Sequence, residues 1–81
     1  MVLEFEALHV PTLTKEVAAN LEQVLEPLIG IVELKINLEN QSVQILFDEN
    51  RVGFLDLTQA MAKAGCPLRQ IDAALLKKFS T

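Results

Sequence analysis

Two neighbouring segments in the middle of the chain alternate between apolar and polar residues. In residues 31–38, IVELKINL, every second residue is apolar, and in residues 43–48, VQILFD, Val43, Ile45 and Phe47 share one side. A period of two is typical of a strand with one buried face and one solvated face. The polar residues ENQS between the segments supply a turn, so the sequence predicts a β-hairpin. The side chains expected to point inward are Val32, Leu34, Ile36, Leu38, Val43, Ile45 and Phe47.

Two other segments repeat apolar residues at helical spacing. The first follows Thr14, a favourable N-cap residue, and Pro27 and Gly30 favour its end. The second occupies residues 54–65 and ends at a glycine suited to a helix C-terminus. The expected apolar stripes are Val17, Leu21, Val24, Leu25 and Leu28 in the first helix, and Phe54, Leu57, Met61 and Ala64 in the second.

The two ends of the chain are less regular. Near the N-terminus, Leu3, Phe5 and Ala7 share one phase whereas Leu8 and Val10 share the other, which predicts either a bulge or a strand apolar on both faces. Near the C-terminus, CPLRQI has room for a short last strand. The tail, residues 72–81, is then expected to form a final helical turn starting at Asp72, with Leu75, Leu76 and Phe79 as its apolar contacts.

The order of these elements is β-α-β-β-α-β, which predicts one α+β domain over residues 1–81. We expect a ferredoxin-like sandwich: a four-stranded antiparallel sheet, two helices on one face, and a short C-terminal helical extension. The opposite face of the sheet is left for water or a partner. Leu46 is its apolar exception, and with Leu8 or Val10 beside it an apolar patch would result. The residues expected on this interaction face are Glu33, Lys35, Asn37, Gln44 and Leu46.

Composition narrows the classes of function. The net charge is −4 and the seven basic residues are scattered, whereas nucleic-acid binding needs a clustered positive face. No apolar run approaches a membrane span, the N-terminus carries no basic leader, and the single cysteine, Cys66, forms no intramolecular disulfide. We therefore expect a cytoplasmic protein that binds neither nucleic acid nor membrane. No nucleophile stands beside both a base and an orienting carboxylate, so no enzyme is expected.

Residues 28–65 resemble the body of a heavy-metal-associated (HMA) domain, the copper-chaperone fold. That family has a Gly-hydrophobic step into its second strand, an aromatic-Asp end to its third strand and an Ala-Gly end to its second helix. Gly30-Ile31, Phe47-Asp48 and Ala64-Gly65 occupy these places. The resemblance implies the same βαββαβ fold.

The family's metal loop, Met-x-Cys-x-x-Cys, holds Cu(I) between two thiolates because soft ligands select a soft ion. Counting back from Gly30 places Thr14 and Val17 at the cysteine positions and Thr12 at the methionine position; matching VPT instead gives Lys15 and Ala18. Neither register supplies a thiolate. The resemblance is therefore to a divergent member with a degenerate metal site, and no cofactor is expected.

Two interpretations of function follow. The first is a metal-site-less protein-interaction module that associates with an unknown protein or with itself as a homo-oligomer. The alternative is a divergent heavy-metal, and specifically copper, carrier that uses Cys66 and His9 as a weak two-ligand site. As residues of an ordinary fold, Cys66 would be a small buried side chain and His9 a surface residue at the end of a strand.

Overall fold

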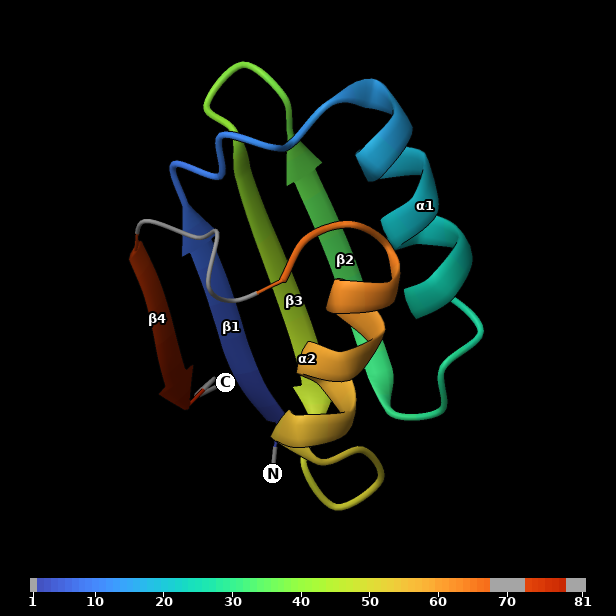
Figure 1. The fold of residues 1–81 in the computed structure, drawn as a ribbon. Helices are drawn as coiled ribbons and strands as arrows, with labels where there is room; N and C mark the ends of the chain where they lie inside the picture. The colour runs from blue at the N-terminus through green and yellow to red at the C-terminus, as the bar shows by residue number, and fades with distance from the viewer. Residues whose placement is uncertain (1, 68–72, 79–81) are drawn as a thin grey trace.

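A four-stranded antiparallel sheet with both helices on one face forms the body of the molecule (Figure 1). The computed structural model describes residues 2–67 and 73–78. The strand order is β2-β3-β1-β4, so β2 and β4 are the edge strands. The predicted ferredoxin-like βαββαβ fold is confirmed. Its elements are β1 (Val2–Leu8), α1 (Lys15–Leu25), β2 (Ile31–Asn37), β3 (Ser42–Asp48), α2 (Phe54–Lys63) and β4 (Ala73–Lys78).

The central strand β3 supplies the middle of the core. Its inward side chains, Val43, Ile45 and Phe47, are fully buried between the sheet and the helices. Each such side chain contributes about 1.5–3 kcal/mol of hydrophobic stabilisation relative to an exposed position. The predicted phase of β3 is therefore correct, because these side chains pack with Leu21 and Leu25 of α1 in one cluster.

A bulge in β2 changes the phase of its first residues. Ile31 pairs with Phe47, but the next pair along β3 joins Glu33 to Leu46, so Val32 is an extra residue in the ladder. Its side chain is 59% exposed, and the prediction that it points inward was wrong. Beyond the strand, Leu38 lies in the turn and is also exposed, contrary to the prediction. Leu34 and Ile36 point inward as predicted and pack against the core.

The irregular phase of the N-terminal segment comes from a turn. Strand β1 ends at Leu8, and His9 has a positive φ of 55°, which redirects the chain. Val10 then enters the core from outside the sheet and is fully buried. The ladders of β1 run without a bulge, and Val10 lies beyond the strand, so the expectation that Val10 points outward was wrong.

Helix α1 begins and ends where its sequence signals predict. The Thr14 side chain caps its N-terminus, and the last helical hydrogen bond is donated by the backbone N–H of Glu26, directly before Pro27. Gly30 then adopts a φ of +104°, and a Cβ at this residue would lie 2.7 Å from Cγ1 of Val52. Both the backbone conformation and the close approach require glycine here.

The tail forms a strand in place of the predicted helical turn. Residues Ala73–Lys78 form β4, which pairs antiparallel with β1. Alanine, leucine and lysine are good helix formers, but pairing supplies partners to the backbone groups of β1 that would otherwise lie on a sheet edge. Cys66 and Pro67 are not in a strand, and the rest of the predicted strand at 66–71, with Asp72 and Phe79, lies outside the described residues.

Candidate functional site

The positions that match the metal loop of the HMA family have structural roles in this chain. The hydroxyl Oγ1 of Thr14 accepts a hydrogen bond from the backbone N–H of Val17 at 3.2 Å, which caps α1. The side chain of Val17 is half-buried and packs against the core. In the other register, Lys15 is exposed and Ala18 is buried. One candidate position thus supplies a helix cap, and two supply packing.

The segment that leads into α1 is fixed to the rest of the fold. The backbone N–H of Val10 donates to the carbonyl oxygen of Gln41 in the β2–β3 turn at 2.8 Å, and the N–H of Leu13 donates to the carbonyl oxygen of Val10 at 3.1 Å. The side chains of Val10 and Leu13 are both buried. Between them, Oγ1 of Thr12 is buried without a hydrogen-bond partner among the described residues. A hydroxyl is a hard ligand that remains protonated, so it does not replace a methionine sulfur.

Cys66 lies next to this loop, because the turn that precedes it packs against α1. A Cβ built on Gly65 would be 3.6 Å from Cγ2 of Val17. The Cys66 side chain is fully buried, and burial raises the pKa of its thiol. The thiol therefore stays protonated near neutral pH, whereas the thiolate is the form that binds metals.

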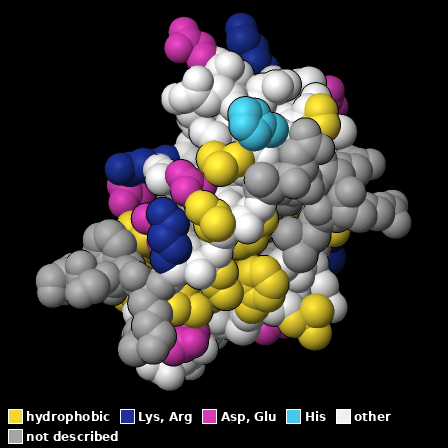
Figure 2. All heavy atoms as spheres, turned by 90° about the vertical axis from the view of Figure 1, so that its left-hand side faces the viewer, with side chains coloured by type: hydrophobic (Ala, Val, Ile, Leu, Met, Phe, Trp, Pro, Cys, Tyr) yellow, Lys and Arg dark blue, Asp and Glu magenta, His cyan; other side chains and the backbone are white. Residues whose placement is uncertain are grey.

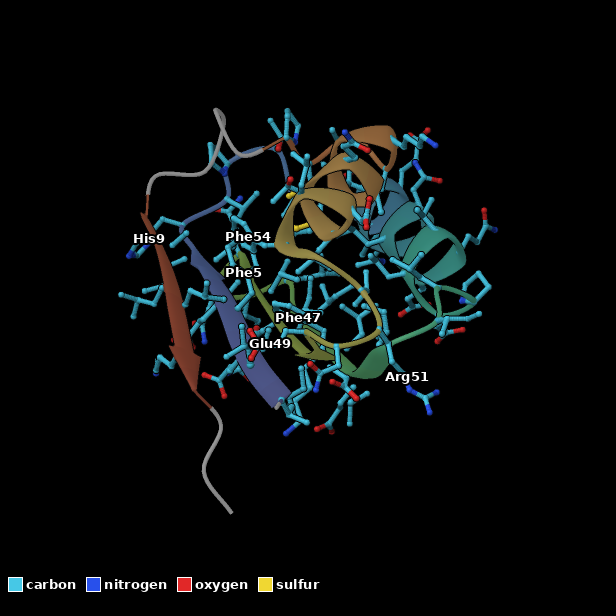
Figure 3. All side chains as sticks on the ribbon, turned by 90° about the horizontal axis from the view of Figure 1, so that it is seen from below. Phe5, His9, Phe47, Glu49, Arg51 and Phe54 are labelled. Carbon is cyan, nitrogen blue, oxygen red and sulfur yellow. The ribbon has the colours of Figure 1, made fainter. Side chains whose placement is uncertain are left out.

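His9 is an exposed residue at the far end of β1. Figure 3 shows it at the periphery of the molecule, away from Phe5 and Phe47. It lines a polar hollow of about 540 Å³ together with Glu6, Glu39 and Ser42, among others. No hydrogen bond joins these side chains to His9 in the part of the chain that the structure describes. His9 and Cys66 therefore differ sharply in exposure, and nothing in the described contacts brings them together.

The donor set does not fit the family's metal. Across residues 2–67 and 73–78, no group of three or more His, Cys, Asp or Glu side chains is placed to hold a metal ion. The one cysteine is buried with its proton, and the loop positions offer hydroxyl and hydrocarbon groups instead of thiolates. The chain's own residues thus do not assemble a two-thiolate centre.

The open face of the sheet carries all five residues predicted there. Glu33 lies opposite Leu46, Lys35 lies opposite Gln44, and Asn37 lies opposite Ser42. Lys35 and Glu33 form an ion pair on this face at 3.8 Å. Whether the face binds a partner stays a prediction.

Strand β4 brings one charged side chain, Lys77, to this face, where the sequence did not predict it. Nζ of Lys77 lies 3.6 Å from a carboxylate oxygen of Glu4 and 3.7 Å from one of Glu6. The side-chain amide of Gln44 donates to the other oxygen of Glu6 at 3.1 Å. The glutamates could be read from the alternation of β1, but their lysine lies in the segment that was predicted to be helical.

These groups divide the apolar surface that the sequence suggested. Leu46 is half-buried between Glu4 and Glu33 on the neighbouring strands. Leu8 lies further along the sheet, beyond the bonded Glu6 and Gln44. The expected contiguous patch of Leu46 with Leu8 or Val10 is therefore not formed on this face.

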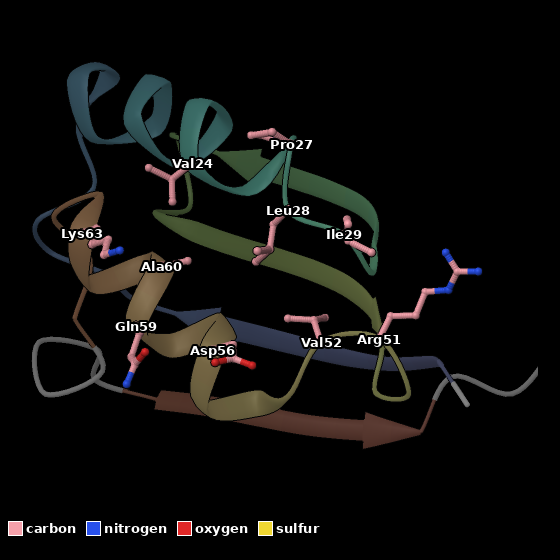
Figure 4. Close-up of a pocket in the computed structure, with 10 residues that line it drawn as sticks. All are labelled: Val24, Pro27, Leu28, Ile29, Arg51, Val52, Asp56, Gln59, Ala60 and Lys63. Atoms are coloured by element: carbon pink, nitrogen blue, oxygen red, sulfur yellow. The ribbon is translucent and has the colours of Figure 1, made fainter.

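A groove separates the two helices on the opposite side of the molecule (Figure 4). Its volume is about 570 Å³, and its walls are mostly apolar, with Arg51 and Lys63 at its two ends. At the Arg51 end, Ile29 of the connection after α1 and Val52 of the loop before α2 line the groove. The residues that line it are Val24, Pro27, Leu28, Ile29, Arg51, Val52, Asp56, Gln59, Ala60 and Lys63.

Solved structures of metal-binding domains share this fold. Oxidized MerP from Ralstonia metallidurans CH34 superposes with a TM-score of 0.65 at 16% identity, covering 96% of this chain and 100% of that one. A copper binding domain from HMA7, a P-type ATPase, gives 0.66 at 16% identity over 96% of each chain. The N-terminal domain of a potential copper-translocating P-type ATPase from Bacillus subtilis gives 0.65 at 19% identity over 95% of this chain and 86% of that one.

These similarities identify an HMA-like fold, as the resemblance in residues 28–65 predicted. No family model matches the chain, and the comparison with curated protein sequences finds no relative. A divergent member is consistent with both results. At these identities the similarity establishes the fold, and the ligand has to be argued from the residues themselves.

Neither helix in the described residues has the length and apolar character needed to cross a lipid bilayer. The cytoplasmic location stays a prediction. Two of the structural neighbours named above are domains of P-type ATPases. For this chain, the expectation that it is no enzyme stays a prediction as well.

Proposed function

We propose that this domain is an HMA-like protein-interaction module in which the metal loop has become a structural element. One observation carries the proposal: the loop positions that correspond to ligands now cap and pack α1. The hydroxyl of Thr14 accepts a hydrogen bond from the N–H of Val17, and the side chain of Val17 lies next to Gly65. A side chain that caps a helix or packs in the core is not available to bind a metal ion.

The open face of the sheet supports this proposal. It presents carboxylates, lysines and amides from neighbouring strands on one surface, with Leu46 among them. Such a surface suits a protein partner of matching charge pattern, because charge complementarity confers specificity more than affinity. The interaction face remains Glu33, Lys35, Asn37, Gln44 and Leu46, to which Glu4, Glu6 and Lys77 are added.

The second candidate is a divergent metal carrier, and the comparisons favour it over the interaction module. Of the structural neighbours named above, one is a MerP, one is a copper binding domain, and one is the N-terminal domain of a potential copper-translocating ATPase, solved with Cu(I) bound. In this chain the ion would bind Cys66, beside the former metal loop, with His9 or a second molecule completing the site. The obstacle is chemical, since a buried thiol with a raised pKa has to lose its proton first.

Titration with Cu(I) under reducing conditions separates the two candidates. The protein is mixed with Cu(I) and a competing chelator, and native mass spectrometry reports the metal and subunit count. We expect no complex that survives the chelator. A stoichiometric complex that is lost in Cys66→Ala would overturn the proposal in favour of the carrier.

A double variant serves as the positive control. Thr14→Cys with Val17→Cys restores two thiols at positions i and i+3 on the first turn of α1, where two soft ligands suit Cu(I). This variant is expected to take one Cu(I) per chain from the chelator. If the variant binds Cu(I) in competition with the chelator and the wild-type protein does not, the fold supports the site and only the ligands are missing.

A further inference from the structure

Strand β4 leaves one side of its backbone available. It pairs with β1, and no other described strand lies along its outer edge. The segment AALLKK contains no proline, glycine or bulge that would interrupt a second ladder. An edge of this kind is a template for another strand, because its outward N–H and C=O groups lack strand partners.

Two exposed leucines flank this edge, one on each face of the sheet. Leu75 pairs with Glu6 on the open face and is 48% exposed, whereas Leu76 pairs with Phe5 on the helix side and is 49% exposed. Phe5, the residue opposite Leu76, packs edge-on against the ring of Phe54 with 5.6 Å between centroids. Figure 2 shows hydrophobic side chains gathered on this side of the molecule. Apolar surface is therefore present above and below the free edge.

One of the two lysines of β4, Lys77, is held away from this edge. Lysines on edge strands normally oppose pairing, because their charge must be desolvated when a second strand approaches. Lys77 instead lies over the sheet, where Glu4 and Glu6 neutralise it. The other edge strand, β2, differs because its bulge at Val32 interrupts a regular ladder.

We propose that β4 pairs with β4 of a second copy of this chain, antiparallel and around a two-fold axis perpendicular to the sheet. This axis keeps the helices of both copies on one side. The self-complementary register places Leu75 opposite Leu75 of the second copy and Leu76 opposite its Ala74, so the apolar residues meet on both faces. A register shifted by one residue in each copy would place Leu75 opposite Lys77, which is less favourable.

The inference deepens the proposed function and rests on it, because it names a second copy as a partner. Edge-to-edge pairing of two short strands buries well under the roughly 1,600 Å² of a standard interface. The dimer is therefore expected to be weak and in rapid exchange, with its formation depending on protein concentration. Binding at the open face would still be compatible with it.

Sedimentation velocity over a concentration series up to about 1 mM tests the pairing, since weak interfaces have dissociation constants in this range. The wild-type protein should shift from monomer to dimer. Leu75→Lys should abolish the shift because it places a charge in the centre of the ladder. Leu55→Lys is the matched control. Leu55 is more exposed, at 69%, but lies on α2, so the Leu55→Lys variant should dimerise as the wild-type protein does.

A disulfide test reports the register. In a Cys66→Ala background, Leu75→Cys should form a linked dimer under mild oxidation, because directly opposite Cβ atoms lie about 4.5–5.5 Å apart. Leu76→Cys should do so far less, since Ala74 faces it in this register. Circular dichroism verifies that each variant is folded.

Several outcomes would overturn the inference. A wild-type protein that is monomeric throughout the series excludes pairing but leaves the proposed function in place, since the sheet face could still bind another protein. A dimer that is unaffected by Leu75→Lys, or one that is lost in Leu55→Lys, assigns the contact to another surface. Conversely, tight Cu(I) binding by Cys66 would contradict the proposed function without altering the metal-free dimer measured here.

Discussion

Two threonines in the loop before α1 have opposite hydrogen-bonding states. Oγ1 of Thr14 accepts a hydrogen bond from Val17, and replacing such a cap by alanine costs about 1 kcal/mol. We therefore expect Thr14→Ala to lower the free energy of unfolding by that amount, measured by urea denaturation at an unchanged m-value. Thr14→Ser keeps the hydroxyl and should retain most of the stability.

Thr12 provides the internal comparison. Its buried Oγ1 has no partner among the described residues, so Thr12→Val removes an unsatisfied group at nearly constant shape and should not destabilise the protein. If Thr12→Val lowered the midpoint and Thr14→Ala did not, the cap would be Thr12 and the helix would begin two residues earlier than the structure shows.

The thiol of Cys66 makes stability depend on pH. Because burial raises its pKa above the ordinary value of 9.0, the folded protein keeps a proton that the unfolded chain loses first. The free energy of unfolding should be insensitive to this group well below pH 9 and should decrease as the pH rises past that value. Cys66→Ala should remove this part of the slope, which separates it from the titration of lysines.

The observation that would contradict this expectation is a Cys66→Ala variant with the same slope as the wild-type protein in alkaline urea titrations. A second readout is thiol chemistry. An alkylating reagent should modify Cys66 slowly in the folded protein and rapidly in denaturant, because its side chain is fully buried.

At the scale of single elements, the two faces of β3 differ at adjacent residues. Leu46 lies on the open face opposite Glu4 and Glu33, whereas Ile45 is fully buried. Leu46→Lys places an ammonium between two carboxylates, so we expect a folded protein whose stability changes by less than about 0.5 kcal/mol. Ile45→Lys buries an unpaired charge and should unfold the domain.

Thermal denaturation followed by circular dichroism distinguishes these variants. An unfolded Leu46→Lys variant would mean that the phase of β3 is not the one described. Equal tolerance of both substitutions would contradict the burial of Ile45.

The connection between α1 and β2 depends on one glycine. Gly30→Ala would impose both a positive φ of +104° and a 2.7 Å contact with Val52, so we expect a loss of about 1–3 kcal/mol. Gly53 is the control, since its φ is −76° and a Cβ there meets only an oxygen of Asp56 at 3.6 Å. Gly53→Ala places an alanine at the N-cap of α2 without strain, so it should cost at most about 1 kcal/mol and less than Gly30→Ala, which a pair of urea titrations would check.

For the whole molecule, local patterns predicted most of the fold because short-range physics decides most of it. The alternation around Leu34 and Ile45 fixed the hairpin, and the cap at Thr14 fixed the start of α1. Val32 was placed wrongly because a bulge changes phase without changing composition. Val10 was placed wrongly because a turn at His9 imitates a strand with two apolar faces.

The tail shows where sequence patterns cannot decide. AALLKK has good helix formers, yet it is a strand because β1 would otherwise expose its backbone. The same long-range pairing carries Lys77 to Glu4 and Glu6, so this part of the candidate surface could not be predicted. The absence of thiols from the loop before α1, in contrast, was readable directly from the residues.

The hydrogen bond from Val10 to Gln41 has a consequence for motion. It ties the loop before α1 to the β2–β3 turn, while the buried side chains of Val10 and Leu13 anchor the same loop to the core. Local opening of this loop would have to expose part of the core, so its free energy should approach that of global unfolding. The Val10 amide should therefore exchange with deuterium about as slowly as the amides of β3, and fast exchange would show a loop that opens by itself.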